Sequence, residues 1–170
     1  MYSLRRRLRE NAAPTLKFLT EVTFAGLAMQ FGALPFAGRI LQGVDGSFYG
    51  TTAGGGTSSQ GTVFKITPAG VETLLYSFAG GFVGVADGGD PNTALILGSD
   101  GNLYGTSGGG IGNDGTLFKV TPTGVETVLY YFEGGTAVNR PGGLIQSVEG
   151  KFYGTSAYGG SSNLGTVFIF

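Results

Sequence analysis

The 170-residue chain contains no cysteine, no histidine and no tryptophan. Without cysteine it can form neither a disulfide framework nor a thiolate metal site. The absence of histidine removes the commonest metal ligand and the usual general base near neutral pH. We therefore expect no metal site and no other cofactor, and the residue types assign no catalytic group.

Positive charge is scarce outside the N-terminal segment. The formal net charge of −1 comes from 10 basic and 11 acidic residues. Five of the basic residues lie before residue 18, whereas ten of the acidic residues follow it, so the rest of the chain has a balance of 5 − 10 = −5. Because this part has no basic stripe, we expect no binding to nucleic acid.

Long uninterrupted apolar runs are also absent. A cationic start followed by the uncharged stretch 22–38 gives a weak secretory signal. Glycine, glutamine and proline interrupt this stretch, so it is too broken to span a membrane. The favoured alternative is that residues 15–39 are a degenerate partial repeat, because residues 15–26 end in the same Phe-Ala-Gly as residues 71–80. Only residues 1–14 would then be a tail.

Glycine is abundant, with 34 residues, far above the usual share of about 7 per cent. Between the glycines, short runs of Leu, Ile, Val, Phe and Tyr alternate with turn residues, which is typical of β-strands. Two motifs built on these runs occur three times each. One is Asp-Gly-x-Phe/Leu-Tyr-Gly-Thr, with Glu for Asp in the last copy, and contains Tyr49, Tyr104 and Tyr153. The other is Gly-Thr-Val/Leu-Phe and begins at Gly61, Gly115 and Gly165.

The spacing of the motifs predicts the fold. The period is 55 and then 49 residues between the three motif tyrosines, and a period of roughly 40 to 50 residues is the size of one propeller blade. Four strands are predicted in the second repeat, at residues 94–97, 103–106, 115–121 and 125–132. Asp100-Gly101 predicts a tight hairpin turn, because both positions tolerate positive φ. We predict an all-β fold, a β-propeller-type array of about three four-stranded antiparallel blades that forms a partial or open propeller.

One repeat domain is expected, preceded by a basic tail. Its parts are the tail at 1–14, a degenerate partial repeat with an outer strand and inter-blade loop at 15–39, repeat 1 at 40–94, repeat 2 at 95–143 and an incomplete repeat 3 at 144–170. The last repeat has only three strands, so its edge is open to pairing. We expect either a head-to-tail homodimer or the missing remainder of a longer chain to complete it.

The two motifs, recurring in order over about residues 40–170, resemble the GloVer tandem-repeat family, the repeats of the choice-of-anchor proteins. The resemblance implies a secreted or surface-exposed bacterial protein of β-propeller type. It implies no established activity and no catalytic residues.

The long loops are predicted to gather on one face. Successive antiparallel strands place alternate connections on opposite edges, so the tight turns share one face and the long loops share the other. Long loops on a rigid scaffold are where binding usually resides. The candidate ligand-binding residues on this face are Asp87, Asp90, Asn92, Asn113, Asp114, Arg140, Tyr158 and Asn163.

Other polar and aromatic residues have simpler structural interpretations. The oxygens of residues 87–92 could bind a hard cation such as calcium, but a polar turn is favoured. The motif tyrosines could stack on sugars or bases, but packing between blades is favoured. The turn carboxylates Asp45, Asp100 and Glu149 fit their turns, and an acid and base pair for sugar cleavage is only a formal alternative. Lys65 and Glu72 could pair across strands.

The sequence favours a noncatalytic repeat module that acts as a surface or secreted interaction scaffold, with a protein or glycan ligand. A carbohydrate-active propeller enzyme that uses Asp87, Asp90 or Asp114 is the first alternative. A purely structural spacer, whose repeats only set length, is the second.

Overall fold

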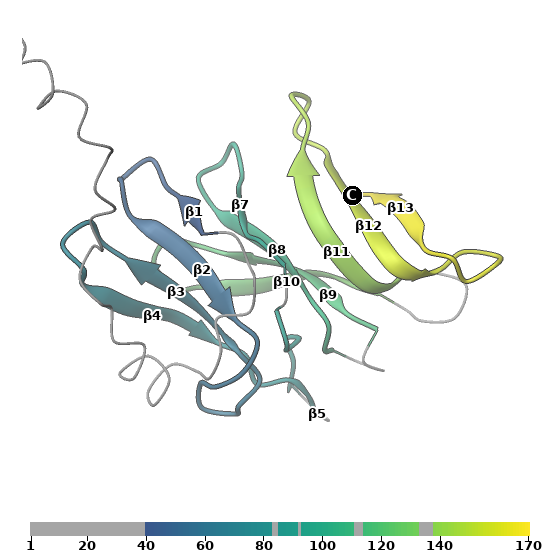
Figure 1. The fold of residues 1–170 in the computed structure, drawn as a ribbon, viewed down its shortest axis with the longest axis horizontal. Coiled ribbons are helices and arrows are strands. Elements are labelled where there is room, and N and C mark those ends of the chain that lie inside the picture. Colours follow the sequence, from purple (N-terminus) through teal and green to yellow (C-terminus); the bar gives the residue numbers. More distant parts are fainter. Residues whose placement is uncertain (1–39, 83–84, 92, 111–113, 133–137) are drawn as a thin grey trace, which may run out of the picture.

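The structure is a computed structural model that describes residues 40–170, except residues 83–84, 92, 111–113 and 133–137. All regular elements in this part are strands (Figure 1). The first sheet contains β1 (Leu41–Gln42), β2 (Phe48–Thr52), β3 (Thr62–Ile66) and β4 (Glu72–Ser77). The second contains β7 (Ile96–Leu97), β8 (Leu103–Ser107), β9 (Thr116–Val120) and β10 (Glu126–Tyr131). The third contains β11 (Val138–Gln146), β12 (Phe152–Gly159) and β13 (Thr166–Ile169). A short hairpin, β5 (Gly81–Phe82) and β6 (Val85–Ala86), lies between the first two.

The three sheets follow one another in chain order and pack face to face (Figure 1). Neighbouring strands in each sheet are antiparallel, so each sheet is an up-and-down meander. The predicted all-β, propeller-type array is confirmed, with two sheets of four strands and a third of three. The degenerate repeat predicted at 15–39 lies outside the described residues.

The turn between the first two strands of each repeat depends on one glycine. In the second sheet, Gly101 has φ 78°, and its N–H donates to the carbonyl of Gly98 at 2.9 Å. The N–H of Gly98 donates to the carbonyl of Asn102 at 2.8 Å, so the loop has three residues. Only the glycine adopts positive φ here. The tight turn predicted at Asp100-Gly101 is present, and Asp100 contributes by accepting the N–H of Asn102 through Oδ1 at 3.1 Å.

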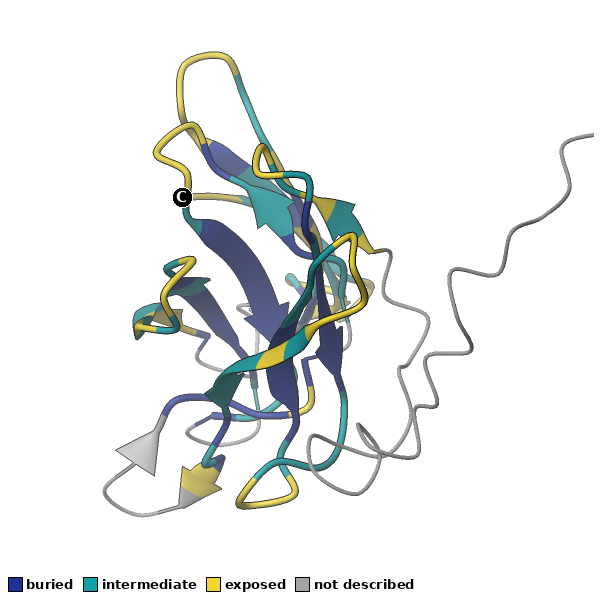
Figure 2. Cartoon of the chain, turned by 90° about the vertical axis from the view of Figure 1, so that its left-hand side faces the viewer, coloured by how far each residue is buried: buried dark blue, intermediate teal, exposed yellow. Residues whose placement is uncertain are grey.

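The core lies between the sheets, and the same positions of each repeat build it. Figure 2 shows that buried residues concentrate in the central strands. The first interface contains Tyr49, Val63, Phe78, Leu95, Leu103, Phe118 and Val120. The second contains Tyr104, Leu117, Phe132, Leu144 and Phe152, with Phe168 packed against it. Since equivalent residues fill both interfaces, one repeat buries its face only against the next.

Two contacts recur at these interfaces. The Phe that follows the fourth strand packs on the Phe of the next sheet's third strand, with ring centroids 5.1 Å apart for Phe78 and Phe118 and 5.0 Å apart for Phe132 and Phe168. A threonine hydroxyl of the second strand donates to a carbonyl that leads into the next sheet. Thr106 Oγ1 reaches the carbonyl of Gly142 at 2.9 Å. Thr51 makes the equivalent bond to Thr93 at 3.4 Å.

Candidate functional site

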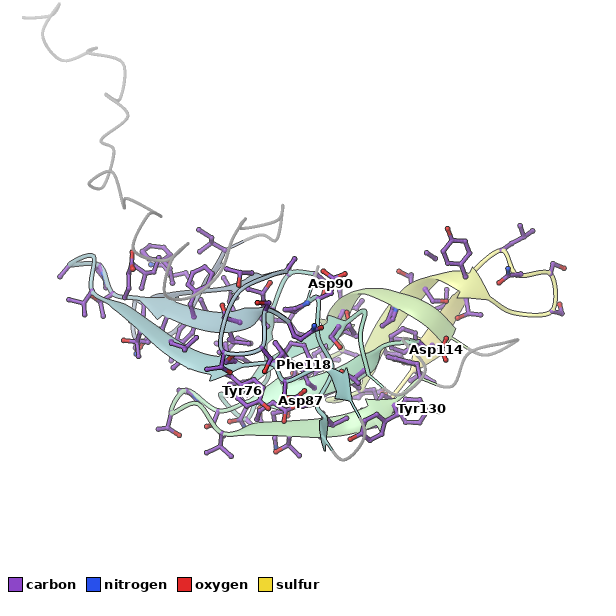
Figure 3. The ribbon with its side chains drawn as sticks, turned by 90° about the horizontal axis from the view of Figure 1, so that it is seen from below. Tyr76, Asp87, Asp90, Asp114, Phe118 and Tyr130 are labelled. Atoms are coloured by element: carbon purple, nitrogen blue, oxygen red, sulfur yellow. The ribbon has the colours of Figure 1, made fainter. Side chains whose placement is uncertain are left out.

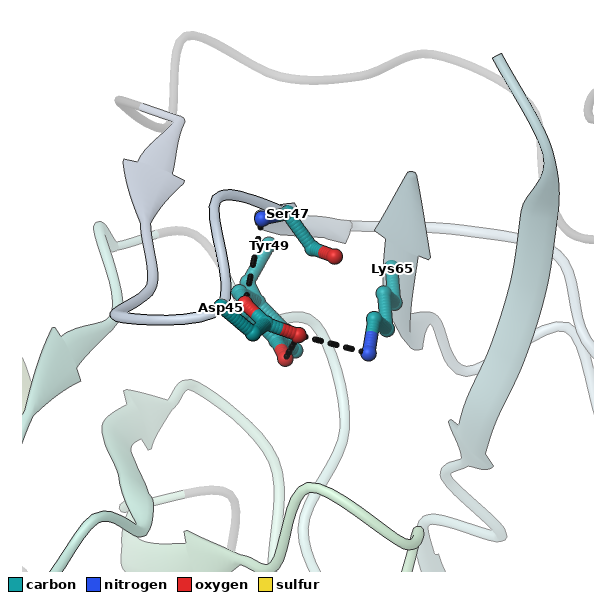
Figure 4. Close-up of polar contacts among 4 residues, drawn as sticks. All are labelled: Asp45, Ser47, Tyr49 and Lys65. Carbon is teal, nitrogen blue, oxygen red and sulfur yellow. Dashed lines mark hydrogen bonds and ion pairs between the residues drawn. The ribbon is translucent and has the colours of Figure 1, made fainter. Parts of the chain in front are cut away.

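The carboxylate of Asp45 organises the first turn of the first sheet (Figure 4). It accepts the N–H of Ser47 at 3.0 Å and the hydroxyl of Tyr49 at 3.1 Å, and Lys65 Nζ lies 2.8 Å from Oδ2. The bond from Lys65 is the main reason that the pKa of Asp45 is well below its usual range. Lys65 therefore pairs with Asp45. The pairing expected with Glu72 is wrong, because Glu72 lies opposite Ile66 in the register and so points to the other face.

Asp100 repeats this arrangement in the second sheet. Its Oδ2 accepts the side-chain N–H of Asn102 at 2.7 Å and the hydroxyl of Tyr104 at 2.8 Å. Burial alone would raise the pKa of Asp100, but these hydrogen bonds together lower it. Burial, followed by the bond to Asp100, raises the pKa of Tyr104 to about 12. Tyr49 and Tyr104 are buried and bonded to their turns, as the packing interpretation of the motif tyrosines requires.

Asp87 is a buried carboxylate used by the fold. Its oxygens accept the hydroxyl of Tyr76 at 2.5 Å and the N–H groups of Ala79 and Gly80 at 2.9 Å. Burial is the main cause that raises the pKa of Tyr76, followed by its bond to Asp87. These contacts fix the chain where β4 leads into the long loop. A cation at Asp87 would have to displace three donors.

Glu126, at the start of β10, is a group that the sequence did not single out. It is half-buried, and its Oε1 is buried with no hydrogen-bond partner among the described residues. Burial, followed by the nearby charge of Asp87, raises the pKa of Glu126 to about 7. The only sequence signal is that Glu72 occupies the same place in the first repeat. Nothing in that repetition identifies Asp87 as the neighbour of Glu126.

We expect Glu126 to make the free energy of unfolding fall as the pH rises from 4.5 to about 7. Over this range the folded chain holds the proton and the unfolded chain releases it, so deprotonation favours unfolding. The full shift would correspond to about 3 kcal/mol. Exposure of about half the side chain to solvent reduces this to about 1 to 2 kcal/mol.

Urea denaturation of the wild type and of Glu126→Gln below and above this range measures the effect. The difference in stability between the two proteins should change with pH by that amount. The control is Glu72→Gln, the equivalent substitution on β4. If the wild type and Glu126→Gln show the same pH dependence, Glu126 is not the titrating group.

The long loops of neighbouring sheets are joined by backbone hydrogen bonds. The N–H of Asp90 donates to the carbonyl of Gln60 at 2.8 Å, and the N–H of Gly109 donates to the carbonyl of Gly89 at 2.8 Å. The carbonyl of Asp90 accepts the N–H of Gly108 at 3.2 Å. Loops that belong to two sheets therefore form one continuous surface, as the alternation of strands predicted.

The described candidate residues lie in different surroundings. Asp90 is exposed and has φ 49°. Figure 3 shows Asp87 beside Tyr76, with Asp90 and Asp114 at separate places. In the third sheet Tyr158 is exposed, and Asn163 accepts the N–H of Gly159 through Oδ1 at 2.9 Å.

The structure does not describe three of the candidate side chains. Asn92 and Asn113 lie outside the described residues, and so does the side chain of Arg140 in β11. Within the described part of the chain, no three His, Cys, Asp or Glu residues lie close enough together to hold a metal ion. The candidates that the structure describes are therefore not gathered into one polar centre.

Comparison with known families identifies the repeat. The model of the Gloeobacter/Verrucomicrobia repeat matches residues 11–170. The chain belongs to this family. The match confirms the resemblance read from the two motifs. The match also includes residues 11–39, before the first described strand.

A solved structure of similar fold supports the propeller-type architecture. A streptogramin B lyase structure has 16% sequence identity and a TM-score of 0.50, and the match covers 79% of this chain and 42% of that chain. A virginiamycin B lyase from Staphylococcus aureus has 15% identity and a TM-score of 0.49, with 77% and 40% covered. The chain thus spans about two-fifths of the length of these proteins. No curated protein matches the sequence. None of the described elements is a long apolar helix that could cross a membrane.

Proposed function

We propose that the chain is a noncatalytic interaction scaffold that binds a ligand on its long-loop face. The observation that carries the proposal is the set of hydrogen bonds by which Gln60, Gly89, Asp90, Gly108 and Gly109 join the loops of two sheets. A loop surface fixed by backbone bonds loses little conformational entropy on binding, which favours recognition. We also propose, from the family resemblance, that the module works outside the cytoplasm.

The engagement of the carboxylates supports a role without catalysis. Asp45, Asp87 and Asp100 each accept several hydrogen bonds from the fold itself. A general acid or base must exchange its proton with a substrate within hydrogen-bond reach. A glycosidase would also need two carboxyl groups facing each other across the bond to be cleaved. Asp90 and Asp114 lie at separate places on the molecule (Figure 3).

The exposed residues of the face suit a ligand rich in hydroxyl groups. Thr57, Ser58, Ser59 and Asp90 are exposed around the joined loops, and Tyr158 is exposed on the third sheet. Hydroxyls and carboxylates bond to sugar hydroxyls, and a tyrosine ring can stack on a sugar face. We therefore take a glycan as the first ligand to test and a protein as the second.

A glycan array, with a hydrolysis assay on the same panel, tests this function. We expect retention of some glycans without turnover. Asp90→Ala and Tyr158→Ala should each weaken binding by about 10-fold or more, as for the loss of one contact of 1.4 kcal/mol or more. The matched control is Val44→Ala, an exposed residue in a tight turn on the opposite face.

Two results would contradict the proposal. Turnover that Asp90→Asn or Asp114→Asn abolishes would favour the carbohydrate-active enzyme. Absence of binding to both the glycan array and a panel of extracellular matrix proteins would favour the spacer. Circular dichroism of each variant establishes that any loss of binding occurs in a folded protein.

A further inference from the structure

The outward side of the third sheet is an apolar face without a neighbour among the described residues. We call it the outer face and define it by Ile145, Tyr153, Thr155, Val167 and Ile169. Ile145, Tyr153 and Ile169 lie opposite one another across β11, β12 and β13. Thr155 and Val167 form the next row. Ile145 is 67% exposed, Val167 77% and Ile169 57%.

The positions of Tyr153, Thr155 and Val167 are buried in the other two sheets. Val63 and Leu117, which correspond to Val167, are 0% and 1% exposed. Tyr49 and Tyr104, which correspond to Tyr153, lie in the two core clusters. The second sheet covers these residues of the first sheet, and the third sheet covers those of the second. The outer face therefore has the composition of an interior surface, and exposed apolar faces of this kind mark interaction sites.

One substitution makes the outer face more apolar than its equivalents. Lys65 and Lys119 occupy the place of Ile169 in the first two sheets. Lys65 is held there by its ion pair with Asp45. Isoleucine in place of lysine gives no advantage to a surface that stays in water, but it favours a surface that becomes buried.

The third sheet also lacks a fourth strand among the described residues. The third strand of the other sheets pairs with a fourth, as β3 with β4 and β9 with β10. Among the described residues β13 pairs only with β12. Beside β13 lies a cavity of about 190 Å³, lined mainly by Tyr130, Phe132, Phe168 and Phe170. Tyr130 is exposed there, whereas its equivalent Tyr76 packs against the first core cluster.

The chain itself carries the complementary surface at its other end. The residues that cover the second sheet are Leu144, Phe152 and Phe168 of the third. Their equivalents in the first sheet are Ile40, Phe48 and Phe64, so the pattern of three apolar residues is retained. Phe64 is already buried, but Ile40 is 59% exposed and Phe48 is half-buried. The first sheet of one copy thus has the apolar residues needed to cover the third sheet of another copy, as the third sheet covers the second.

We propose that the outer face binds the first sheet of a second copy of this chain, head to tail. Such an interface is heterologous, because two different surfaces meet. Two chains form a closed ring when the first sheet of each covers the outer face of the other. Thr155 would donate to a carbonyl of the second copy, as Thr106 does to Gly142.

Two lysine substitutions on opposite ends test the arrangement. Val167→Lys blocks the outer face, and Ile40→Lys blocks the covering face. By size-exclusion chromatography with light scattering, we expect the wild type to be a dimer and each variant alone to be a monomer. An equal mixture of the two variants should recover a dimer, because one unmodified outer face meets one unmodified covering face. The control is Val125→Lys, at an exposed position just before β10 of the second sheet. This variant should be a dimer like the wild type.

The mixture separates this proposal from its alternatives. If two outer faces paired symmetrically, Ile40→Lys would stay dimeric and mixing would rescue nothing. A wild type that is a stable monomer over a wide concentration range would overturn the proposal. If Val167→Lys fails to fold, Ile145→Lys replaces it. The outcome is independent of ligand binding on the loop face, which the glycan array tests separately.

Discussion

Gly115→Ala should destabilise the fold by about 2 to 5 kcal/mol. Gly115 has φ 108°, which costs an alanine about 1 to 2 kcal/mol. A Cβ there would also lie 2.4 Å from Cδ of Pro141 and 2.7 Å from the carbonyl oxygen of Ser107. Both neighbours are held in strands, so relief of this overlap adds about 1 to 3 kcal/mol. Urea denaturation of wild type and variant measures the loss.

Gly101→Ala is the matched control for that experiment. Gly101 has a similar positive φ of 78°, but nothing lies within 4 Å of the position of its Cβ. It should therefore lose only the backbone component, about 1 to 2 kcal/mol. Equal losses at the two sites would show that the contact with Pro141 does not constrain Gly115.

Asp87→Asn should cost about 2 to 4 kcal/mol although it changes only one side-chain atom. The carboxylate accepts from Tyr76, Ala79 and Gly80 at once. The side-chain amide of asparagine has one acceptor oxygen, and its NH2 group is itself a donor. It therefore cannot accept from all three donors, and buried donors are left unpaired. Removal of the charge should also lower the pKa of Glu126, because the charge of Asp87 is the second cause that raises it.

Chemical denaturation and an NMR titration of Glu126 follow the two effects. The control is Asp90→Asn, three residues along the same loop, where the side chain is exposed. Asparagine adopts the left-handed conformation of Asp90 readily, so its effect should stay within about 0.5 kcal/mol. If both variants are equally stable, the hydrogen bonds to Asp87 do not hold the loop.

The loop face was predictable from the sequence and the chemistry of its residues was not. Antiparallel alternation requires the long connections to gather, and the bond between Asp90 and Gln60 joins two of them. Asp87 and Asp90 looked equivalent in the chain. The structure buries the first beneath Tyr76 and exposes the second, because the loop turns between them.

The sequence by itself determined the class of fold and the position of the strands. A strand is encoded by local alternation of apolar residues and a turn by local residues such as Asp100 and Gly101, so a repeat that occurs three times specifies three similar sheets. Because they recur in every repeat, the turn carboxylates could be assigned to the turns and the motif tyrosines to packing between the sheets.

Only the tertiary structure decided which residues of different repeats meet. Gly115 reads as a loop residue until Pro141 of the next sheet is placed against it. Glu126 occupies the place of Glu72 in the repeat, and the nearby charge of Asp87, which helps to raise the pKa of Glu126, follows only from the fold. Val63 and Val167 occupy the same place in their repeats, but the second sheet buries Val63 whereas none of the described residues covers Val167. These properties depend on the stacking of sheets, and contacts between residues far apart in the chain leave no local pattern in a single sequence.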